Sequence, residues 1–359
     1  MSNIKFFPFL STNKRVQSIE ACRLLASIAV VFIHCRMPGN LGEIANGLAR
    51  FAVPFFFVVS GYFTFNATLD QIRKRMIGTA KLNIFSTLLY LLWKSYKTRY
   101  IFGESRILWF KNSLSIHNIA SWVFLNTNPF SEHLWYLNAI FICYYLIYLY
   151  ISWKNNSSTS FHTLYKISFL LLLLHLSLGT FATAVQHDFP NLIYRNALFF
   201  GLPMFTLGLF LREYQDNFFT VFHLSNVVLW CLILLGGILV LLERFGFGKV
   251  DLHIGSIVTV ISLMLLLISN PQVTQNNQIL LKAIPKFGSL STWIYVTHVF
   301  WKDLFLTFSL ERYIDNTFGK HLTAYILPFV VITISLFTGI IWEIVRAIVH
   351  RFKHNFNNN

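Results

Sequence analysis

A guanidinium and an imidazole side chain share one apolar stretch, SIEACRLLASIAVVFIHCR, at residues 18–36. Arg23 and His34 are eleven residues apart. That spacing is close to three helical turns, so both side chains lie on one face, roughly 16 Å apart along the helix axis. Glu20 and Ser27 fall on the same face. A guanidinium can bind phosphate groups, and an imidazole can take up and release a proton near neutral pH. The alternative interpretation is a structural Glu20–Arg23 ion pair and a hydrogen-bonded core histidine.

A second histidine, His298, lies inside another apolar segment, STWIYVTHVF, with Lys302 one helical turn later. Ionisable side chains at membrane depth are costly, and those that occur usually face a cavity or a partner. We therefore expect His34 and His298 to share a polar cavity. The alternative is a hydrogen bond between His298 and a backbone carbonyl.

Two further motifs bring polar groups into apolar segments. In FAVPFFFVVSGYF, Gly61 lets another helix or a ligand approach the backbone, and Ser60 either lines a cavity or bonds to its own helix. In SEHLWYL, Trp135 either lines a cavity or belongs to an aromatic belt at the membrane interface. We expect His133 in this motif to be solvated.

The densest short cluster of positive charge, Arg73-Lys74-Arg75, follows the apolar segment FAVPFFFVVSGYF. One interpretation is an anchor on the cytoplasmic side of the membrane. The other is a phosphate clamp, because guanidinium groups bind phosphate through two parallel hydrogen bonds. The cytoplasmic position of this cluster, with an even number of spans, places both termini in the cytoplasm.

The composition indicates a membrane protein, because the chain of 359 residues is 55% hydrophobic and 12% charged, with a mean hydropathy of +0.57. Topology and anionic lipid headgroups explain most of the net charge of +15, so no nucleic-acid partner is expected. The four cysteines stand singly, and no metal site is expected. Motifs for phosphate-binding loops, dinucleotide binding, helical zinc sites and hydrolase elbows are absent from the sequence.

The apolar segments predict an all-α polytopic membrane protein with about ten transmembrane helices, each near the length that crosses a bilayer. We expect one integral-membrane domain over 1–359, with a cytoplasmic segment at 1–17 and a flexible tail at 350–359. The expected spans, from the distribution of apolar residues, are 18–36, 51–67, 79–96, 134–152, 166–184, 192–211, 221–242, 253–269, 289–309 and 322–347.

The long loop at about 97–132 mixes aromatic and aliphatic residues with polar ones. That mixture predicts either a short helix in the plane of the lipid headgroups or a lid over a site. Internal repeats, which many transporters carry, are not evident in the sequence.

These motifs occur together and in order: Arg and His with ten residues between them, FFFVVSGYF, basic residues after it, HLWYL, and an aromatic-aliphatic-His run in a late span. The set resembles the membrane acyltransferase-3 family, bacterial ten-span enzymes that O-acylate exported glycans. The resemblance covers roughly Ile19 to His298 and the closing span. Many members carry Arg-x-x-Arg in the inner loop, whereas this chain has IRKRM, which leaves open whether Arg73 or Arg75 takes each role.

The resemblance implies an O-acetyltransferase of the bacterial inner membrane that uses acetyl-CoA, or another acyl-CoA, as donor substrate and holds no permanent cofactor. The acceptor would be a lipid-linked or exported glycan such as O-antigen of lipopolysaccharide, enterobacterial common antigen, capsule or exopolysaccharide. A membrane lipid or peptidoglycan acceptor stays open. The implied roles are His34 as general base, Glu20 orienting Arg23, acyl-CoA binding by Arg23, Arg73 and Arg75, and cavity lining by Ser60, Trp135 and His298.

Two alternatives remain at this point. The first keeps the enzyme and replaces direct transfer with an acyl-histidine intermediate on His34. The second is a multispan permease or lipid-linked-sugar carrier, which would share the apolar spans and buried charges but has no reason to bind CoA.

Overall fold

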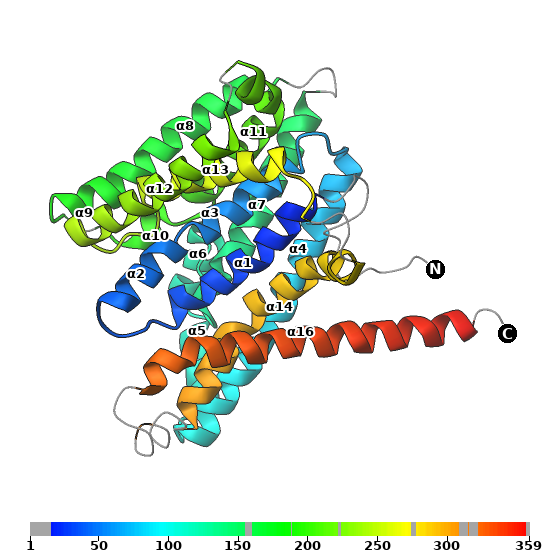
Figure 1. The fold of residues 1–359 in the computed structure, drawn as a ribbon. Coiled ribbons are helices and arrows are strands. Elements are labelled where there is room, and N and C mark those ends of the chain that lie inside the picture. The colour runs from blue at the N-terminus through cyan, green and yellow to red at the C-terminus, as the bar shows by residue number, and fades with distance from the viewer. Residues whose placement is uncertain are drawn as a thin grey trace. The chain divides into compact units, whose positions relative to one another are not determined.

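The computed structural model describes residues 16–154, 160–187, 189–221, 224–273, 278–308, 315 and 322–356, and these residues contain helices and no strand. Most of the expected N-terminal segment, residues 1–15, lies outside the described residues, and so do residues 357–359 of the expected tail. The last helix continues to Phe356, through most of the segment expected as tail. The helices of Figure 1 are α1 (Gln17–His34), α2 (Gly39–Ala49), α3 (Ala52–Tyr62), α4 (Leu69–Tyr96), α5 (Arg106–Ser113), α6 (Ile116–Leu125), α7 (Trp135–Trp153), α8 (His162–Leu176), α9 (Ala182–Ala184), α10 (Asn191–Tyr194), α11 (Leu202–Thr220), α12 (Asn226–Gly246), α13 (Ile254–Ser269), α14 (Gln278–Thr307) and α16 (Leu322–Phe356).

Seven helical segments among the described residues are long and apolar enough to cross a membrane. The helices α11, α13 and α14 overlap three further expected spans but are not among the seven. The structure therefore supports a multi-pass helical protein, and the count of about ten spans and the cytoplasmic position of the termini stay predictions. The seven segments are Gln17–His34, Gly39–Tyr62, Leu69–Ile101, Glu132–Trp153, His162–Ala184, Asn226–Gly246 and Leu322–Val349.

The chain forms two compact units. The large unit comprises Met1–Ile19 and Arg50–Pro271, and the small unit comprises Glu20–Ala49 and Gln272–Asn359. The small unit contains nearly all of α1 together with α2, α14 and α16.

Close helix packing in the large unit depends on glycine. A Cβ atom added to Gly61 in α3 would lie 1.8 Å from the backbone oxygen of Phe205 in α11, and one added to Gly208 in α11 would lie 2.0 Å from the backbone oxygen of Val58 in α3. Because neither backbone oxygen has room to move away from such an atom, only glycine allows the two helices to approach this closely. The prediction that Gly61 admits another helix is confirmed.

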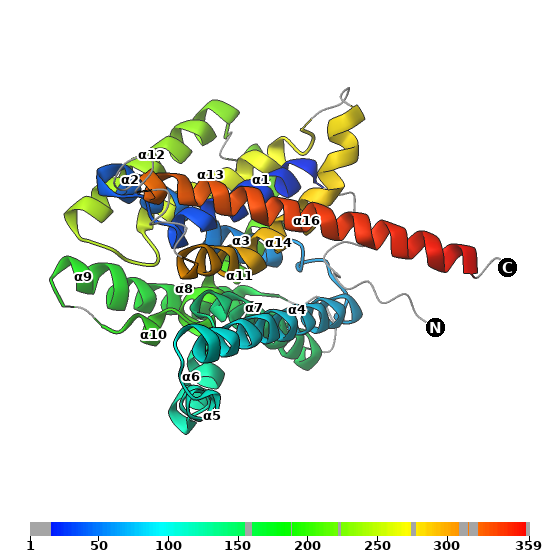
Figure 2. The ribbon, with the colours of Figure 1, turned by 90° about the horizontal axis from the view of Figure 1, so that it is seen from below.

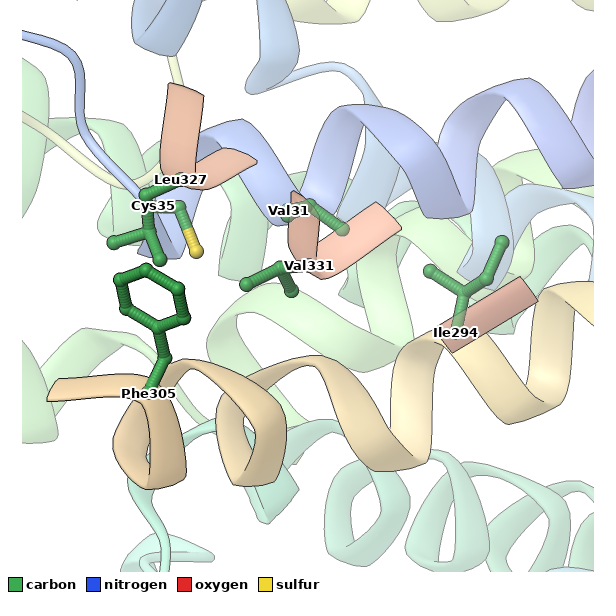
Figure 3. Packing of buried hydrophobic residues seen from close by; sticks show 6 residues of the cluster. All are labelled: Val31, Cys35, Ile294, Phe305, Leu327 and Val331. Carbon is green, nitrogen blue, oxygen red and sulfur yellow. The ribbon is translucent and has the colours of Figure 1, made fainter. Parts of the chain in front are cut away.

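In the small unit, α14 runs in the same direction as α1. Ser291 of α14 donates a hydrogen bond to the backbone oxygen of Arg23, and Lys302 donates one to the backbone oxygen of His34, each pair being 268 positions apart. Two turns of the C-terminal helix α16 complete an apolar core with α1 and α14. Figure 3 shows its buried members, Val31, Cys35, Ile294, Phe305, Leu327 and Val331.

The expected loop at 97–132 contains two short helices, α5 and α6, which lie at the edge of the large unit in Figure 2. The hydroxyls of Ser105 and Ser115 cap their N-termini by accepting hydrogen bonds from backbone N–H groups. Neither helix contains a buried residue, and Ile107 and Ile116 are 82% and 89% exposed. Such exposed apolar side chains suit a helix at the lipid headgroups, and the lid interpretation stays open.

Candidate active site

The first polar group on α1 is an ion pair. Nη1 of Arg23 lies 3.1 Å from Oε1 and 3.3 Å from Oε2 of Glu20, and both residues are buried. The predicted ion pair is therefore present. Gly288 of α14 packs directly against it, because a Cβ atom at this position would lie 2.6 Å from Oε2 of Glu20 and 3.3 Å from Nη1 of Arg23. A buried guanidinium requires a paired anion, and Glu20 supplies it.

The second polar group is a pair of histidines. The ring centroids of His34 in α1 and His298 in α14 are 5.1 Å apart, with an angle of 51° between the ring planes. The residue His298 is fully buried, and its Nδ1 atom lies 2.9 Å from the backbone oxygen of Ile294 and 2.8 Å from that of Tyr295. Carbonyl oxygens only accept, so Nδ1 carries the hydrogen. Of the two alternatives that the sequence left for His298, the hydrogen bond to a backbone carbonyl is present, and the polar cavity shared with His34 stays a prediction.

The end of α1 that carries His34 is held by side chains from two other helices. The last carbonyl groups of a helix have no partner within it. The side-chain Nδ2 of Asn46 in α2 donates to the backbone oxygens of Phe32 and Ile33, each at 3.1 Å. The ammonium of Lys302 in α14 donates to the backbone oxygen of His34 at 2.6 Å. These contacts fix the position of the His34 backbone.

The predicted common face of α1 is the face packed against α14. The ion pair contacts Gly288, the backbone of Arg23 accepts from Ser291, and the ring of His34 lies beside His298. Ser27, between them on this face, is fully buried and donates to its own helix at the backbone oxygen of Leu24. The small unit therefore places a cation at one end of this face and an imidazole pair at the other.

The remaining predicted site residues, Ser60, Arg73, Arg75 and Trp135, belong to the large unit. The hydroxyl of Ser60 donates to the backbone oxygen of Phe56 at 2.8 Å, so the alternative in which Ser60 bonds to its own helix is present. The guanidinium of Arg75 donates to the backbone oxygen of Phe63 at 2.8 Å and to the hydroxyl of Thr64 at 3.0 Å, so it caps the end of α3. Arg73 is exposed.

Residues of the SEHLWYL motif are more buried than is expected for an aromatic belt at the membrane interface. Trp135 is only 8% exposed, its ring packs edge-to-face on Phe200, and the guanidinium of Arg195 lies 5.6 Å from the ring centroid. The expectation that His133 is solvated is wrong. It is 3% exposed, its Nδ1 lies 2.8 Å from the hydroxyl of Ser131, and its ring packs on a tyrosine.

A charged network that the sequence did not predict surrounds Asp251, in the turn between α12 and α13. The guanidinium of Arg50 donates to Oδ1 of Asp251 at 2.8 Å. Nε of Arg195 lies 3.7 Å from Oδ2 of Asp251, and the guanidinium of Arg195 also forms an ion pair with Glu132. Burial alone raises the pKa of the Asp251 carboxyl, but the guanidiniums of Arg195 and Arg50 outweigh it and hold the pKa below its ordinary value. No local motif marks this network, because its members come from four distant segments.

Histidine and carboxylate side chains are also the groups from which a metal site would be built. Within the described ranges, no cluster of three or more histidine, cysteine, aspartate or glutamate side chains could hold a metal ion.

The family model described as an acyltransferase domain matches residues 16–345, nearly the whole chain. The chain belongs to the acyltransferase-3 family. With its apolar helices, this membership indicates a multi-pass membrane protein of that family. The expectation drawn from the ordered motifs is confirmed at this level.

Two curated relatives match more distantly. An amino-acid racemase from Enterococcus faecalis is 24% identical over 267 residues, which is 67% of this chain and 34% of the relative. A serine/alanine racemase from Enterococcus gallinarum is 27% identical over 308 residues, 79% of this chain and 40% of the relative. The chain thus spans only about a third to two fifths of the length of these relatives. No solved structure matches it.

Proposed function

We propose that this protein is an O-acyltransferase, and specifically an O-acetyltransferase, of the bacterial inner membrane. It transfers an acyl group from acyl-CoA to a hydroxyl of an exported surface glycan. The observation that supports this proposal best is the position of His34 beside His298, on the same helix face as the buried Arg23, in a chain of the acyltransferase-3 family.

In this proposal His34 acts as the general base. Its unprotonated ring nitrogen accepts the proton of the acceptor hydroxyl while the oxygen forms a bond to the thioester carbonyl carbon. The tetrahedral intermediate then collapses, the carbon–sulfur bond breaks, and the CoA thiolate takes the proton from the His34 imidazolium. The products are the ester and CoA thiol, and His34 is neutral again. In the acyl-histidine alternative, His34 itself first attacks the thioester.

Binding of the donor requires cations, because CoA carries several phosphate groups. Arg23 is the proposed phosphate-binding residue of the small unit, and Glu20, which contacts it at 3.1 Å, orients its guanidinium. Arg73 and Arg75 of the large unit remain proposed donor-binding residues. The capping contacts of Arg75 and the exposure of Arg73 favour Arg73 for phosphate binding.

The test of the base is His34→Ala, with glycan-bound acetyl ester measured by mass spectrometry of surface glycans. We expect a loss of about 10²-fold or more, the usual contribution of a general base. The matched control is His117→Ala, which removes an exposed histidine from α6 and should leave the ester unchanged. Ester at the wild-type amount in His34→Ala would end the assignment.

The test of the donor is the thermal shift of the purified protein on addition of CoA. A ligand that binds only the folded state raises the melting temperature, so we expect stabilisation of the wild type and a smaller shift for Arg23→Ala. The absence of any shift in the wild type would favour the permease or carrier. Incubation with labelled acyl-CoA without acceptor separates the two chemistries, since only the covalent route leaves label on the peptide that contains His34.

A further inference from the structure

The segment at 97–131 carries positive charge that the expected membrane topology does not explain. With the N-terminus in the cytoplasm, as the sequence predicts, the loop after the third candidate span lies on the outer face of the membrane. Lysine and arginine are usually in excess on the cytoplasmic side instead. The cations of this segment therefore need a reason other than the orientation of the chain. It contains four cations and one carboxylate, which are Lys97, Arg99, Arg106, Lys111 and Glu104.

The helices α5 and α6 form a hairpin (residues 106–125) at the edge of the large unit, as Figure 2 shows. Nδ2 of Asn118 in α6 donates to the backbone oxygen of Asn112 in α5 at 2.9 Å, which links the two helices. The ring centroids of Trp109 and Trp122 lie 6.0 and 6.3 Å from that of Phe130, which is buried. The two tryptophans thus mark the side by which the hairpin packs on the large unit.

The other side of the hairpin combines apolar and positive side chains. On α5, Ile107 and Lys111 are two residues before and two after Trp109, which places both about 160° around the helix from it. On α6, apolar residues recur at the i, i+3 and i+7 spacing of one helical stripe. Six apolar side chains of the hairpin are 43–89% exposed, namely Ile107, Leu108, Ile116, Ile119, Val123 and Phe124.

The cations beside these apolar residues are available to an anion. Arg99, Arg106 and Lys111 are exposed, and no carboxylate among the residues that the structure describes forms an ion pair with any of them. The guanidinium of Arg106 lies 5.0 Å from the ring centroid of Tyr100, which restrains the cation. A restrained guanidinium can still donate hydrogen bonds from its edge, and phosphate is an acceptor that matches it.

We propose that the hairpin is a docking surface for anionic phospholipid. Its apolar side chains enter the boundary between headgroups and acyl chains, and Arg106 and Lys111, with Arg99 from the end of the preceding span, bind the lipid phosphate groups. This goes beyond a position at the headgroups, because it requires lipid with net negative charge. The inference does not depend on the base or the donor site proposed above.

A second copy of the chain suits this surface less well than lipid does. In a symmetric dimer the same patch meets itself, so Arg106 and Lys111 of one copy would lie close to the cations of the other. Like charges brought together at an interface are unfavourable, whereas an anionic lipid layer supplies the opposite charge. The adjoining span is also consistent with lipid, because Leu88 and Leu92 of α4 are 50% and 69% exposed.

The experiment measures backbone hydrogen exchange of the full-length protein in nanodiscs. The discs contain phosphatidylcholine alone, or phosphatidylcholine with about three parts in ten phosphatidylglycerol to supply an anionic surface. Helices of 8 and 10 residues are marginally stable in water, so contact with lipid should slow exchange in them. For the wild type we expect exchange in the peptides that cover 106–125 to be about tenfold slower with phosphatidylglycerol, since each cation near an anionic surface contributes about fivefold.

The main variant is Arg106→Gln combined with Lys111→Gln, which keeps the apolar residues. We expect its exchange over 106–125 to differ by less than about twofold between the two compositions. The matched control, Lys166→Gln combined with Lys249→Gln, removes two exposed cations from α8 and from the turn between α12 and α13. This control should keep the wild-type difference.

The apolar part of the surface is tested by Ile116→Ser combined with Phe124→Ser. We expect faster exchange over 106–125 than in the wild type in both compositions, because less apolar surface enters the lipid. Exchange at the wild-type rate would overturn the apolar contact.

Salt supplies a test of the charge contact that needs no variant. At about 1 M salt the screening length is about 3 Å, so the difference between the two compositions should disappear in the wild type. Equal exchange in both compositions at low salt, or a wild-type difference in the Arg106→Gln, Lys111→Gln variant, overturns the inference. Exchange that slows with protein concentration in detergent, and not with lipid charge, overturns it in favour of a second copy.

Discussion

Replacement of Asn46 by alanine should disturb the site without touching any residue that we place in the chemistry. Asn46 is fully buried in α2, and its side-chain amide nitrogen is 3.1 Å from the backbone oxygens of Phe32 and Ile33. These are two of the last carbonyls of α1, immediately before His34. Alanine cannot donate to them.

The magnitude follows from the two acceptors. A buried acceptor left without its partner costs about 1–3 kcal/mol, so two of them cost roughly 2–6 kcal/mol. Fraying of the last turn of α1 recovers part of this, because frayed carbonyls can reach water, and we expect a loss of stability of about 2–3 kcal/mol. The same fraying displaces His34, and a displacement of about 1 Å at a catalytic group can lower kcat by about 10²-fold.

The assay measures the melting temperature and kcat of the purified protein in one detergent. We expect a melting temperature lower by several degrees, kcat lower by more than tenfold, and a KM for acyl-CoA near wild type. The matched control is Asn40→Ala, which removes an exposed asparagine from the same helix. If Asn46→Ala equals this control in both quantities, the contacts of Asn46 do not position His34.

Three further predictions concern other parts of the chain. For Gly288→Ala we expect weaker acyl-CoA binding in a titration at nearly unchanged melting temperature. The new Cβ would meet the movable side-chain ends of Glu20, at 2.6 Å, and Arg23, at 3.3 Å, and would shift the ion pair. Unchanged affinity would contradict this. Because the pKa of Asp251 is lower in the folded than in the unfolded protein, its carboxylate stabilises the fold fully above its ordinary pKa of 3.8, and this stabilisation is lost as the pH falls through the lower folded value. The melting temperatures of Asp251→Asn and the wild type should therefore differ most above about pH 4 and least at the acid end of a pH series. We expect Arg75→Ala to lower the melting temperature because it caps α3, and Arg73→Ala to weaken CoA binding without that loss; the reverse pattern would assign the phosphate contact to Arg75.

Much of the first helix could be predicted from the sequence. Helical periodicity is local, so the spacing of Arg23 and His34 was sufficient to place them on one face, and the contacts with α14 confirm it. The close approach at Gly61 was also predictable, because a glycine within an aromatic and β-branched run leaves a gap in the helix surface that a neighbouring backbone can fill. The family followed from the order of several motifs, each of them weak alone.

The partners of these residues could not be predicted in the same way. The residues that hold the end of α1, Asn46 and Lys302, come from different helices, and neither has a local pattern that points to a carbonyl group. The network around Asp251 could not be predicted for the same reason, because its members come from distant segments of the chain. The prediction that His133 is solvated was wrong for a related reason, because the burial of a residue at the start of a helix depends on the neighbouring helices and not on its own motif.

The parallel course of α1 and α14 explains why the ion pair and the histidine pair lie on the same helix face. Gly288 contacts Glu20, Ser291 bonds to Arg23 and Lys302 bonds to His34, and in each case the residue on α14 lies 268 positions after its partner on α1. Helices with the same rise per residue keep a constant offset of this kind only when they run in the same direction. A displacement of α14 along α1 would therefore move the contact of the ion pair and that of the histidine by the same amount and in the same sense. The parallel pairing thus couples the proposed donor-binding group to the proposed base, because neither contact can shift along the helix axis while the other stays in place.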